Sequence, residues 1–458
     1  MRPAARVAPG PVPLWYTLAW LLVLPLAAGY LLWRAARQPA YLSHWRERFL
    51  GRAPTSGGGA GAPVFWLHAV SVGETRAAQP LIESLARRHE QARFVLTHMT
   101  PTGRAAGLEV ARALPGRVQQ RYLPYDLPFA ARRFLREARP RLGILMETEI
   151  WPNLLQAARE AGVPVVLANG RLSQRSLDRA LRHARLLRAA AAGIAAVGAQ
   201  APADAARIGL LYAGPVIVTG NVKFDRSPEP AQIALGSDLR ARLRARFAPP
   251  QGERPIWLFA STRAGEERLI LQALQARAAQ DVPAPLLLFV PRHPQRFEEV
   301  AELLRAQGAA LLRRADFAEP PVAQGGAVPV LLGDSMGEMA LYYAMADVAL
   351  IGGSLLPLGG QNLIEACACA CPVVLGPHMF NFAQAADDAA GCGAAVRAAD
   401  AGAALGAMAR IAADPAQRAR MAQAGADFWR AHRGATARTV ELIECLLEGR
   451  PLSAAAAN

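Results

Sequence analysis

Short apolar runs alternate with longer stretches in which apolar residues recur every three or four positions, from about residue 63 to residue 448. The first run, PVFWLHAV (63–70), leads into ETRAAQPLIESLARRH (74–89), whose apolar positions share one face of a helix. Continuous apolar runs are typical of parallel strands buried on both sides, and amphipathic stretches are typical of the helices that cover them. The pattern therefore predicts an α/β fold with parallel sheets.

Two stretches rich in glycine, proline and serine interrupt this alternation. One is GRAPTSGGGAGA at residues 51–62, and the other is SPEP at residues 227–230. A chain of 458 residues has the length of two or three domains. The expected segments are an N-terminal segment at residues 1–50, a flexible linker at 51–62, a Rossmann-like domain at 63–226, an inter-domain linker at 227–232, and a second Rossmann-like domain at 233–448 that ends in a capping helix. The helical stretch at residues 413–447 would cap the second domain or cross back to the first.

The N-terminal segment contains twenty consecutive uncharged residues, from Leu14 to Trp33. That length just crosses the hydrocarbon core of a bilayer as a helix, and aromatic residues stand at both ends, as they do at membrane interfaces. The arginines that follow are Arg34, Arg37, Arg46, Arg48 and Arg52, against Arg2 and Arg6 before it. The positive-inside rule places the bulk of the chain in the cytoplasm. Pro25 and the marginal length leave open whether this anchor helix spans the membrane or lies in its interface.

Charge and cysteine content narrow the class of partner. Lysine and arginine outnumber the acidic residues 51 to 36, which favours nucleic acid, a membrane surface or a phosphorylated substrate. The basic stripes interleaved with aromatic residues that are typical of nucleic-acid binders are not evident. Five cysteines are too few for a disulfide framework, and the run CACAC (367–371) has apolar neighbours. We expect these thiols to be buried as small hydrophobic groups rather than to bind a metal.

Acidic and basic residues stand at the ends of predicted strands in the first domain. Glu74 opens the helix that follows the first strand, where a carboxylate either stabilises the helix terminus or serves catalysis. Glu147 and Glu149, in METEIWPN, alternate along the end of another strand and can face the same side of the sheet. Lys223, in GNVKFD, ends the last strand before the linker. These positions predict a charged site at the carboxyl edge of the sheet.

A glycine-rich region from Gly333 to Phe382 organises the second domain. Its glycines, in GGS and GGQN, let backbone amides approach an anion, and a helix expected to begin near Asn362 would add its positive dipole end. Glu365 lies one helical turn later, where its carboxylate could accept from both hydroxyls of a ribose. Arg292 ends another strand, in PRHPQRF, and is a candidate phosphate contact. The chain has neither a D-x-D motif nor a Walker A loop, so we expect a phosphate site built from arginines and helix termini.

Arginines recur along NGRLSQRSLDRALRHARLL (169–187). Arg171, Arg175 and Arg179 are candidates to bind lipid phosphates or anionic headgroups. The alternative is an ordinary solvated helix face.

The chain resembles the family of transferases for 3-deoxy-D-manno-oct-2-ulosonic acid (Kdo). The resemblance covers nearly the whole chain, and its motifs are HAVSVGET, HMTPTGR, YLPYDLP, METEIWPNL, GNVKFD, PRHPQRF, GDSMGEM, GGSL and GPHMFNF. These enzymes transfer Kdo from CMP-Kdo to the lipid A precursor of Gram-negative bacteria. The resemblance implies an inner-membrane protein, active on the cytoplasmic face of that membrane, with two Rossmann-like domains facing a cleft, the GT-B arrangement.

The resemblance also implies roles for individual residues. Glu74 corresponds to the general base, and Glu147 and Lys223 correspond to residues that support the transition state. The residues corresponding to CMP contacts are Pro291, Arg292, Met336, Gly337, Glu338, Asn362, Leu363, Ile364 and Glu365. Gln361 and Leu363 depart from the histidine and proline expected there. The implied reaction inverts the anomeric carbon and uses no metal or other cofactor, and the implied partners are CMP-Kdo, the lipid A precursor and anionic lipid, with no nucleic acid.

Three alternatives remain open from the sequence. A transferase for another sugar or lipid acceptor would carry the same site types. A nucleotide-sugar epimerase shares the two-domain fold and would be indifferent to lipid. A membrane-tethered nucleic-acid binder would account for the basic charge alone.

Overall fold

A computed structural model describes residues 10–36, 38–52, 61–250, 252–277, 284–318 and 329–452. The chain forms two compact units, of which unit 1 comprises residues 1–226 and 432–458, and unit 2 comprises residues 227–431. Most of the predicted linker at 51–62, together with Arg2, Arg6 and Arg37, lies outside the described residues. The two units are described separately below.

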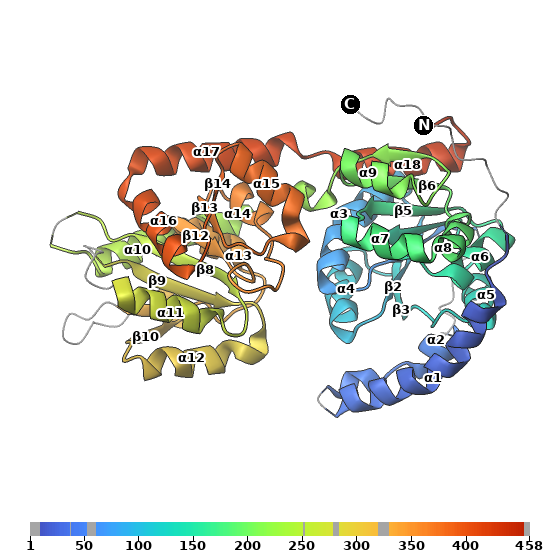
Figure 1. Ribbon diagram of the computed structural model, residues 1–458, viewed down its shortest axis with the longest axis horizontal. Coiled ribbons are helices and arrows are strands. Elements are labelled where there is room, and N and C mark those ends of the chain that lie inside the picture. The colour runs from blue at the N-terminus through green and yellow to red at the C-terminus, as the bar shows by residue number, and fades with distance from the viewer. Residues whose placement is uncertain are drawn as a thin grey trace. The chain divides into compact units, whose positions relative to one another are not determined.

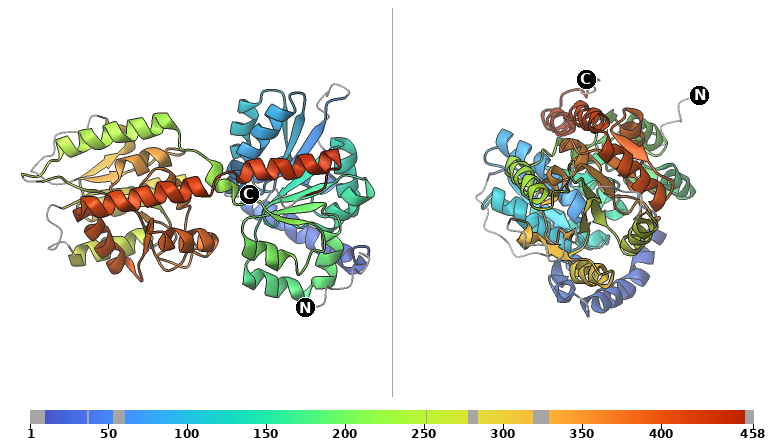
Figure 2. Two further views of the ribbon diagram at one scale, coloured as in Figure 1. Left: turned by 90° about the horizontal axis from the view of Figure 1, so that it is seen from above. Right: turned by 90° about the vertical axis from the view of Figure 1, so that its left-hand side faces the viewer.

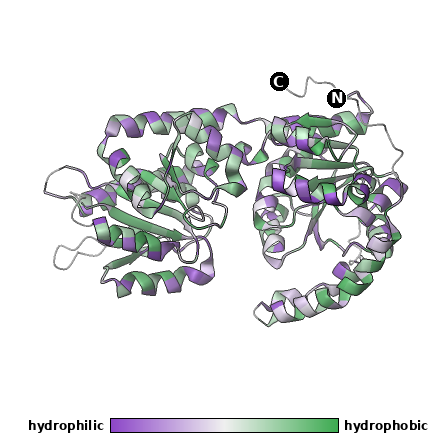
Figure 3. Cartoon of the chain, in the orientation of Figure 1, coloured by the Kyte–Doolittle hydropathy of each residue, from purple (hydrophilic) through white to green (hydrophobic). Residues whose placement is uncertain are grey.

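Unit 1 is built on a seven-stranded sheet in which neighbouring strands run parallel. In spatial order its strands are β3 (Val118–Tyr122), β2 (Arg93–His98), β1 (Val64–His68), β4 (Leu142–Met146), β5 (Val165–Gly170), β6 (Ala196–Ala199) and β7 (Val216–Val218). The central strands are apolar and buried along their length, as expected for a sheet covered on both faces. Figure 3 shows the strands largely in the green of hydrophobic residues.

Helices cover both faces of this sheet (Figure 1). They are α3 (Val72–Arg88), α4 (Pro101–Ala113), α5 (Pro128–Ala138), α6 (Pro152–Glu160), α7 (Gln174–Arg182), α8 (Ala184–Ala191), α9 (Pro202–Ile208) and α18 (Ala435–Glu448), with the 3-10 helix η2 (Val222–Asp225). One apolar cluster joins α3 and α18 to the sheet, and a second joins α5, α6 and α8 to it.

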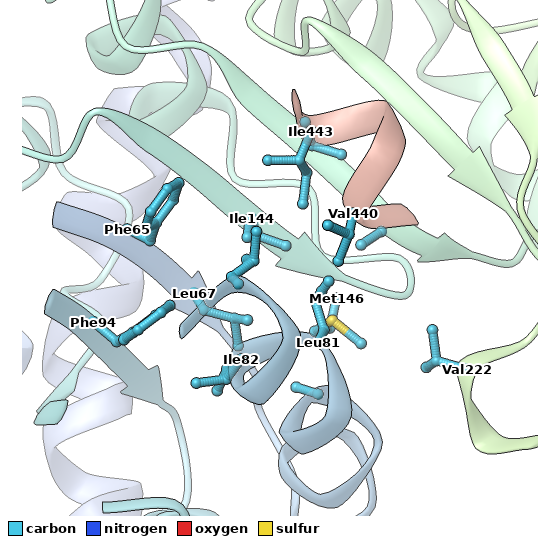
Figure 4. Packing of buried hydrophobic residues seen from close by; sticks show 14 of the residues in the cluster. Phe65, Leu67, Leu81, Ile82, Phe94, Ile144, Met146, Val222, Val440 and Ile443 are labelled. Atoms are coloured by element: carbon cyan, nitrogen blue, oxygen red, sulfur yellow. The ribbon is translucent and has the colours of Figure 1, made fainter. Parts of the chain in front are cut away.

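The C-terminal helix belongs to unit 1, so of the two expected placements, a cap on the second domain or a return to the first, the chain takes the return to the first. Val440 and Ile443 of α18 are fully buried in the cluster around β1, β4 and α3, whose packing Figure 4 shows, and the ribbon of the last helix lies along the sheet of unit 1 in Figure 2. Glu444 also lies 2.9 Å from the Nε2 atom of His89. The helix is interrupted between α17 and α18. Gly434 lies in this interruption, and its amide donates to the Asp225 carboxylate (2.6 Å). The apolar face of α18 matches the surface of the first sheet, and this match decides where the last helix packs.

Unit 2 repeats the architecture with a second seven-stranded parallel sheet. Its strands, in spatial order, are β10 (Leu311–Arg313), β11 (Val330–Leu332), β9 (Leu286–Pro291), β8 (Ile256–Thr262), β12 (Val348–Ile351), β13 (Val373–Leu375) and β14 (Ala395–Arg397). Its helices are α10 (Pro230–Arg246), α11 (Glu266–Arg277), α12 (Phe297–Ala306), α13 (Met339–Met345), α14 (Ile364–Ala368), α15 (Ala383–Gly391), α16 (Ala401–Ala413) and α17 (Pro415–Ala431). The predicted α/β fold with two Rossmann-like domains and an N-terminal apolar helix is confirmed.

The N-terminal helix α1 (Leu14–Ala35) rests on unit 1 by one side. It is the one described helix that is long and apolar enough to cross a membrane by length and composition. The Tyr16 hydroxyl donates to Asp126 (2.8 Å), and Leu31 and Ala35 pack with Tyr41 of the 3-10 helix η1 (Pro39–Leu42). Large apolar side chains on its other faces are exposed: Leu14, Trp15, Leu18, Leu21, Leu22, Val23, Leu26, Tyr30, Leu32 and Trp33.

Asp126 links α1 to α6. Removing its carboxylate should lower the free energy of unfolding more than removing the Tyr16 hydroxyl, which bonds it to α1. The buried carboxylate accepts from the amides of Asn153 (3.0 Å) and Leu154 (2.8 Å) as well as from Tyr16. Asp126→Ala should lower the free energy of unfolding by about 2–3 kcal/mol, and Tyr16→Phe by about 1 kcal/mol. Urea denaturation of the detergent-solubilised protein measures both values. Equal losses would show that α6 does not depend on this carboxylate.

Candidate active site

The loops that follow β1 and β4 lie side by side at the carboxyl edge of the sheet of unit 1. The strand order reverses between these two strands, since β2 and β3 continue on one side and β5, β6 and β7 on the other. Open α/β sheets bind ligands at such a switch point. Glu74 follows β1 in the first turn of α3, and Glu147 and Glu149 follow β4 directly. The topology therefore gathers the three predicted carboxylates at one place.

Glu74 is held by the turn that starts α3. The hydroxyl of Ser71, the N-cap residue, donates to Glu74 Oε1 (2.9 Å), and the Val70 amide donates to Oε2 (2.8 Å). Burial raises the pKa of Glu74, and the charge of Glu147 raises it further, while these hydrogen bonds and Lys223 lower it. Glu74 thus has the helix-capping role that its position suggested. Its carboxylate is also fixed in orientation and more basic than that of an exposed glutamate.

Glu147 and Lys223 form an ion pair beside Glu74. The Nζ atom of Lys223 lies 2.8 Å from Glu147 Oε1, and each side chain is about a quarter exposed. Glu147 has a left-handed φ of 60°, a backbone strain that is typical of functional sites. Lys223 is the single lysine among the 51 lysine and arginine residues of the chain. A lone ammonium in an arginine-rich chain indicates a position that a guanidinium does not serve.

Lys223 reaches Glu147 although β7 and β4 are three places apart in the sheet. The 3-10 helix η2, which carries Lys223, is held over the neighbouring strand by Asn169, whose Oδ1 atom accepts from the Val222 amide (3.1 Å). Asn169 has a φ of 57° and lies at a register irregularity at the end of β5. The sequence analysis gave Asn169 no role. An asparagine that ends the apolar run PVVLA was the available signal, because asparagine is among the residues that tolerate a left-handed backbone.

Glu149 is the third carboxylate of the site, and the sequence did not assign it a separate role. Trp151 Nε1 donates to Glu149 Oε2 (3.0 Å), and His68 Nε2 lies 3.9 Å from the same oxygen. Burial raises the pKa of Glu149 to about 7, with further increases from the charges of Glu74 and Glu147. His68, at the end of β1, is completely buried. Glu149 therefore changes its charge near neutral pH.

In unit 2 the strand order reverses between β8 and β12, and the glycine-rich loop follows β12. Gly352 packs so closely that a Cβ atom would lie 2.3 Å from the Ser261 carbonyl oxygen. The carboxylate of Glu266, at the start of α11, accepts from the amides of Gly353 (2.6 Å), Leu355 (3.0 Å) and Arg263 (2.9 Å). Some of the loop amides that the sequence offered to an anion are therefore used by this buried side chain.

Glu266→Gln should loosen the glycine-rich loop. A glutamine keeps one acceptor oxygen and brings an NH2 group toward backbone amides, so at least one amide loses its partner. We expect the free energy of unfolding to fall by about 1–3 kcal/mol. The affinity for CMP, measured by isothermal titration calorimetry, should fall as well, whereas Glu267→Gln, next to it on α11, serves as a control for stability loss alone. Unchanged CMP affinity in Glu266→Gln would contradict a role of this loop in binding.

Arg292 directly follows β9. It contacts Gln361, which stands where the resemblance leads us to expect a histidine. Its Nε atom donates to Gln361 Oε1 (3.2 Å), and its amide donates to the Thr262 carbonyl (2.9 Å). Gln361 thus helps to orient the guanidinium. Pro291, the last residue of β9, is buried.

The helix expected from Asn362 begins two residues later. Asn362 Oδ1 accepts from the Ile364 amide (3.1 Å), and α14 has only five residues. A helix this short contributes little dipole, and one of its first amides is satisfied by Asn362, so the predicted anion site at this terminus is weaker than expected. The side chains of Leu363 and Ile364 are buried in the core, which leaves only their backbone for contact with a ligand. Glu365 is partly exposed on the first turn.

The start of α13, after β11, is arranged around an ion pair. Arg314 binds both carboxylate oxygens of Glu338 (2.9 Å each), and the Ser335 hydroxyl also donates to Glu338. Burial raises the pKa of Glu338, but the hydrogen bonds from Arg314 and Ser335 outweigh it, so the pKa is lowered overall. Met336 and Gly337 are exposed beside this pair. Glu338 is thus ionised and oriented, and the sequence analysis did not identify Arg314 as its partner.

The arginines predicted to bind lipid phosphates or anionic headgroups lie along α7 and just before it. Arg175 and Arg179 are exposed on α7, whose purple turns are visible in Figure 3, and Arg171 precedes the helix. The buried face of α7 is formed by Leu177. The arrangement leaves a basic surface on unit 1.

The described residues contain no group of three or more histidine, cysteine, aspartate or glutamate side chains that could hold a metal ion. Cys367 and Cys371 are buried, and burial raises the pKa of the Cys367 thiol to about 12. These two thiols therefore pack as apolar groups, as the sequence predicted.

The chain matches a family model described as 3-deoxy-D-manno-octulosonic-acid transferase (kdotransferase) over residues 43–226. A 3-deoxy-D-manno-octulosonic acid transferase of Bordetella pertussis is 46% identical over 436 residues, which cover 94% of this chain and 98% of that protein. The chain belongs to the 3-deoxy-D-manno-octulosonic acid transferase family. As a Kdo transferase it is a glycosyltransferase.

Other relatives agree with this family and fold. A 3-deoxy-D-manno-octulosonic acid transferase of Haemophilus influenzae is 36% identical over 81% of this chain and 83% of its own length. Among solved structures, UDP-GlcNAc 2-epimerase from Neisseria meningitidis, bound to UDP-GlcNAc, has a TM-score of 0.54 at 14% identity. The matched region covers 83% of this chain and 99% of the epimerase. At that identity the likeness shows that the Kdo transferase shares the fold, and nothing about its substrate.

Proposed function

We propose that this Kdo transferase moves Kdo from CMP-Kdo to the lipid A precursor, inverts the anomeric carbon without a metal, and uses Glu74 as its general base. The observation that carries the proposal is the placement of Glu74 at the switch point of unit 1. There it is fixed by Ser71 and Val70 and lies near the Glu147–Lys223 ion pair. A carboxylate that is oriented and more basic than usual is suited to remove a proton from a sugar hydroxyl.

The proposed step is a single displacement. The acceptor hydroxyl oxygen forms a bond to the anomeric carbon of Kdo as the bond from that carbon to the phosphate oxygen of CMP breaks. The hydroxyl proton passes to Glu74, and the electron pair of the broken bond leaves with CMP. Because the attack and the departure occur on opposite faces of the carbon, the configuration inverts. Glu74 contributes to the step by accepting a proton, not by forming a bond to carbon.

The charge on the departing CMP is proposed to be met by cations. Arg292, oriented by Gln361, is a bidentate donor suited to a phosphate. Preorganised donors of this kind stabilise charge that develops in the transition state. The proposed donor contacts in unit 2 are Pro291, Arg292, Met336, Gly337, Glu338 and the segment Asn362–Glu365.

The acceptor is proposed to reach the enzyme from the membrane. The exposed apolar side chains of α1 are suited to burial in a lipid interface, and the hydrogen bond from Tyr16 to Asp126 holds the helix against unit 1. Arg175 and Arg179 present exposed guanidinium groups that fit lipid phosphates. We therefore propose attachment to the cytoplasmic face of the inner membrane, with α1 lying along the interface.

The product mass tests this function. The purified protein is incubated with CMP-Kdo and a tetraacylated lipid A precursor, and the lipid is analysed by mass spectrometry. The expected result is a mass increase by one or more Kdo residues, with CMP released in equal amount and a rate unchanged by a chelator. An unmodified lipid with an altered free sugar, from CMP-Kdo or UDP-GlcNAc, would instead indicate an epimerase. Loss of activity in the chelator would overturn metal independence alone.

A further inference from the structure

His68 is a buried histidine whose tautomer is determined by its neighbours. Its Nδ1 atom faces the Thr97 carbonyl (3.2 Å) and the Thr97 hydroxyl (3.0 Å). The Thr97 hydroxyl donates to the Leu67 carbonyl (3.2 Å), and a carbonyl can only accept. Nδ1 must therefore carry the proton. The other ring nitrogen, Nε2, is then an acceptor.

The acceptor Nε2 faces a carboxyl group. Nε2 is buried and has no hydrogen-bond partner among the described residues, and Glu149 Oε2 lies 3.9 Å from it. Two lone pairs facing each other are unfavourable in a buried site, unless a proton lies between them. The Trp151 indole N–H occupies only one lone-pair direction of Oε2, so the oxygen can still carry a proton.

The proton between them belongs on Glu149 rather than on His68. Complete burial, with His98 nearby, lowers the pKa of His68 to about 3, so its ring stays neutral at physiological pH. Glu149 is partly buried near Glu74 and Glu147, and its pKa is raised to about 7. A charged His68 would be the least favourable ionised form at this site, because its ring is completely buried.

We propose that Glu149 works as a neutral acid whose carboxyl proton faces His68 Nε2, and that it is a positioning residue which leaves Glu74 as the carboxylate without an ion-pair partner among the described residues of unit 1's site. The inference rests on the proposed role of Glu74. The charged and titratable groups that interact with Glu149 are Glu74 from α3, Glu147 after β4 and His68 from β1. Lys223 from η2 pairs with Glu147, and His98 from β2 lies near His68. Lys223 compensates Glu147, so the three carboxyls divide into a base, an ion-pair partner and a neutral acid.

The arrangement has a functional reason. The proposed donor carries a phosphate and a carboxylate, and the proposed acceptor carries phosphates, so a second free anion beside Glu74 would repel both. Ionised Glu149 would also raise the pKa of Glu74 and slow its loss of the proton after the reaction. Activity should fall as the pH rises through about 7, where Glu149 ionises.

The free energy of unfolding should change with pH in the same direction as the activity. Because the folded-state pKa of Glu149 is raised above the value of a free glutamate, its contribution is complete at low pH and is lost as the pH rises through about 7. This decline in the free energy of unfolding should be absent in a variant whose side chain at position 149 cannot ionise. Urea denaturation curves across this pH range measure it.

Glu149→Gln and Glu149→Asp test the inference, with Glu90→Gln, an exposed carboxyl of the same unit, as the control. Glutamine mimics the neutral acid and can donate an N–H to Nε2, whereas the shorter aspartate cannot reach it and ionises readily. Glu149→Gln should lose the alkaline fall in kcat, and Glu149→Asp should lower the rate at ~pH 6.5 at least about tenfold. The infrared band of a protonated carboxyl that titrates near pH 7 should be absent from Glu149→Gln and Glu149→Asp and present in Glu90→Gln.

The outcomes separate the two proposals. A protonated-carboxyl band that persists in Glu149→Gln, or an alkaline fall of activity unchanged in that variant, would overturn the inference. Loss of turnover in Glu149→Gln with intact CMP binding and folding would also overturn it and would make Glu149 itself the base. If Glu74→Gln remains active while the band still depends on Glu149, the proposed base fails, and the neutral state of Glu149 stands by itself.

Discussion

Glu74→Gln should lower the rate of Kdo transfer by about 10²- to 10⁴-fold, the range that general-base catalysis contributes. Glutamine has the shape of the carboxylate and can still accept from the Ser71 hydroxyl or the Val70 amide, so the start of α3 should remain folded. It cannot take the proton of the acceptor hydroxyl. The rate is measured by the mass of the lipid product under single-turnover conditions, and CMP affinity, measured by calorimetry, should stay within about twofold of wild type because the proposed CMP contacts lie in unit 2.

A matched control for this variant exists on the same helix. Glu83 lies on α3 more than two turns after Glu74, and among the described residues its carboxylate accepts from Gln79 alone. Glu83→Gln should transfer Kdo at the wild-type rate. Near-normal transfer by Glu74→Gln would remove Glu74 from the mechanism, and a rate recovered by raising the pH would indicate that another group accepts the proton.

Lys223→Met should lower kcat by about 10²- to 10³-fold, a loss comparable to that of one preorganised electrostatic donor. The change removes the ammonium that lies 2.8 Å from Glu147 and leaves that carboxylate in a half-buried site without this partner. It also removes the positive charge that lowers the pKa of Glu74, so a larger share of Glu74 is protonated at neutral pH and cannot accept the proton of the acceptor hydroxyl. Lys223→Arg should restore little of the rate, since a planar guanidinium does not replace a compact ammonium.

A double-mutant cycle separates this electrostatic role from simple loss of structure. Glu147→Gln and Lys223→Met belong to one pair, so the double variant should be no slower than the slower single variant. The free energy of unfolding of each variant is measured in parallel. Losses that add in the double variant would show that the two side chains act independently, which would contradict the pair.

The sequence alone established the fold class, because its evidence is local. Apolar runs such as PVFWLHAV and RLGILM become buried parallel strands, and the amphipathic stretches between them become the covering helices. Residues at the ends of such runs, including Glu74, Glu147 and Arg292, lie at the carboxyl edge of a sheet whatever the details of packing. The family followed from motifs in their order along the chain. The comparison with known transferases confirms it.

Contacts between distant segments were decided by the tertiary structure. The last helix belongs to unit 1, because its apolar face fits the surface formed by β1, β4 and α3. Glu266 and Arg314 act on residues far away in the sequence, namely the amides of the glycine-rich loop and the carboxylate of Glu338. No local pattern reports such pairs, because each of these residues has an ordinary use at a helix start or on a loop.

The sequence by itself determined which residue types stand at the strand ends, since the alternation of apolar and polar positions decides where each strand stops. Only the tertiary structure decided what those residues are chemically. Glu74, Glu147 and Glu149 are the same amino acid, and burial, a single ammonium and one histidine tautomer make one of them basic, one paired and one the acid we propose to be neutral. The pKa of a side chain depends on solvent access and on charges within a few ångströms, and folding alone sets both.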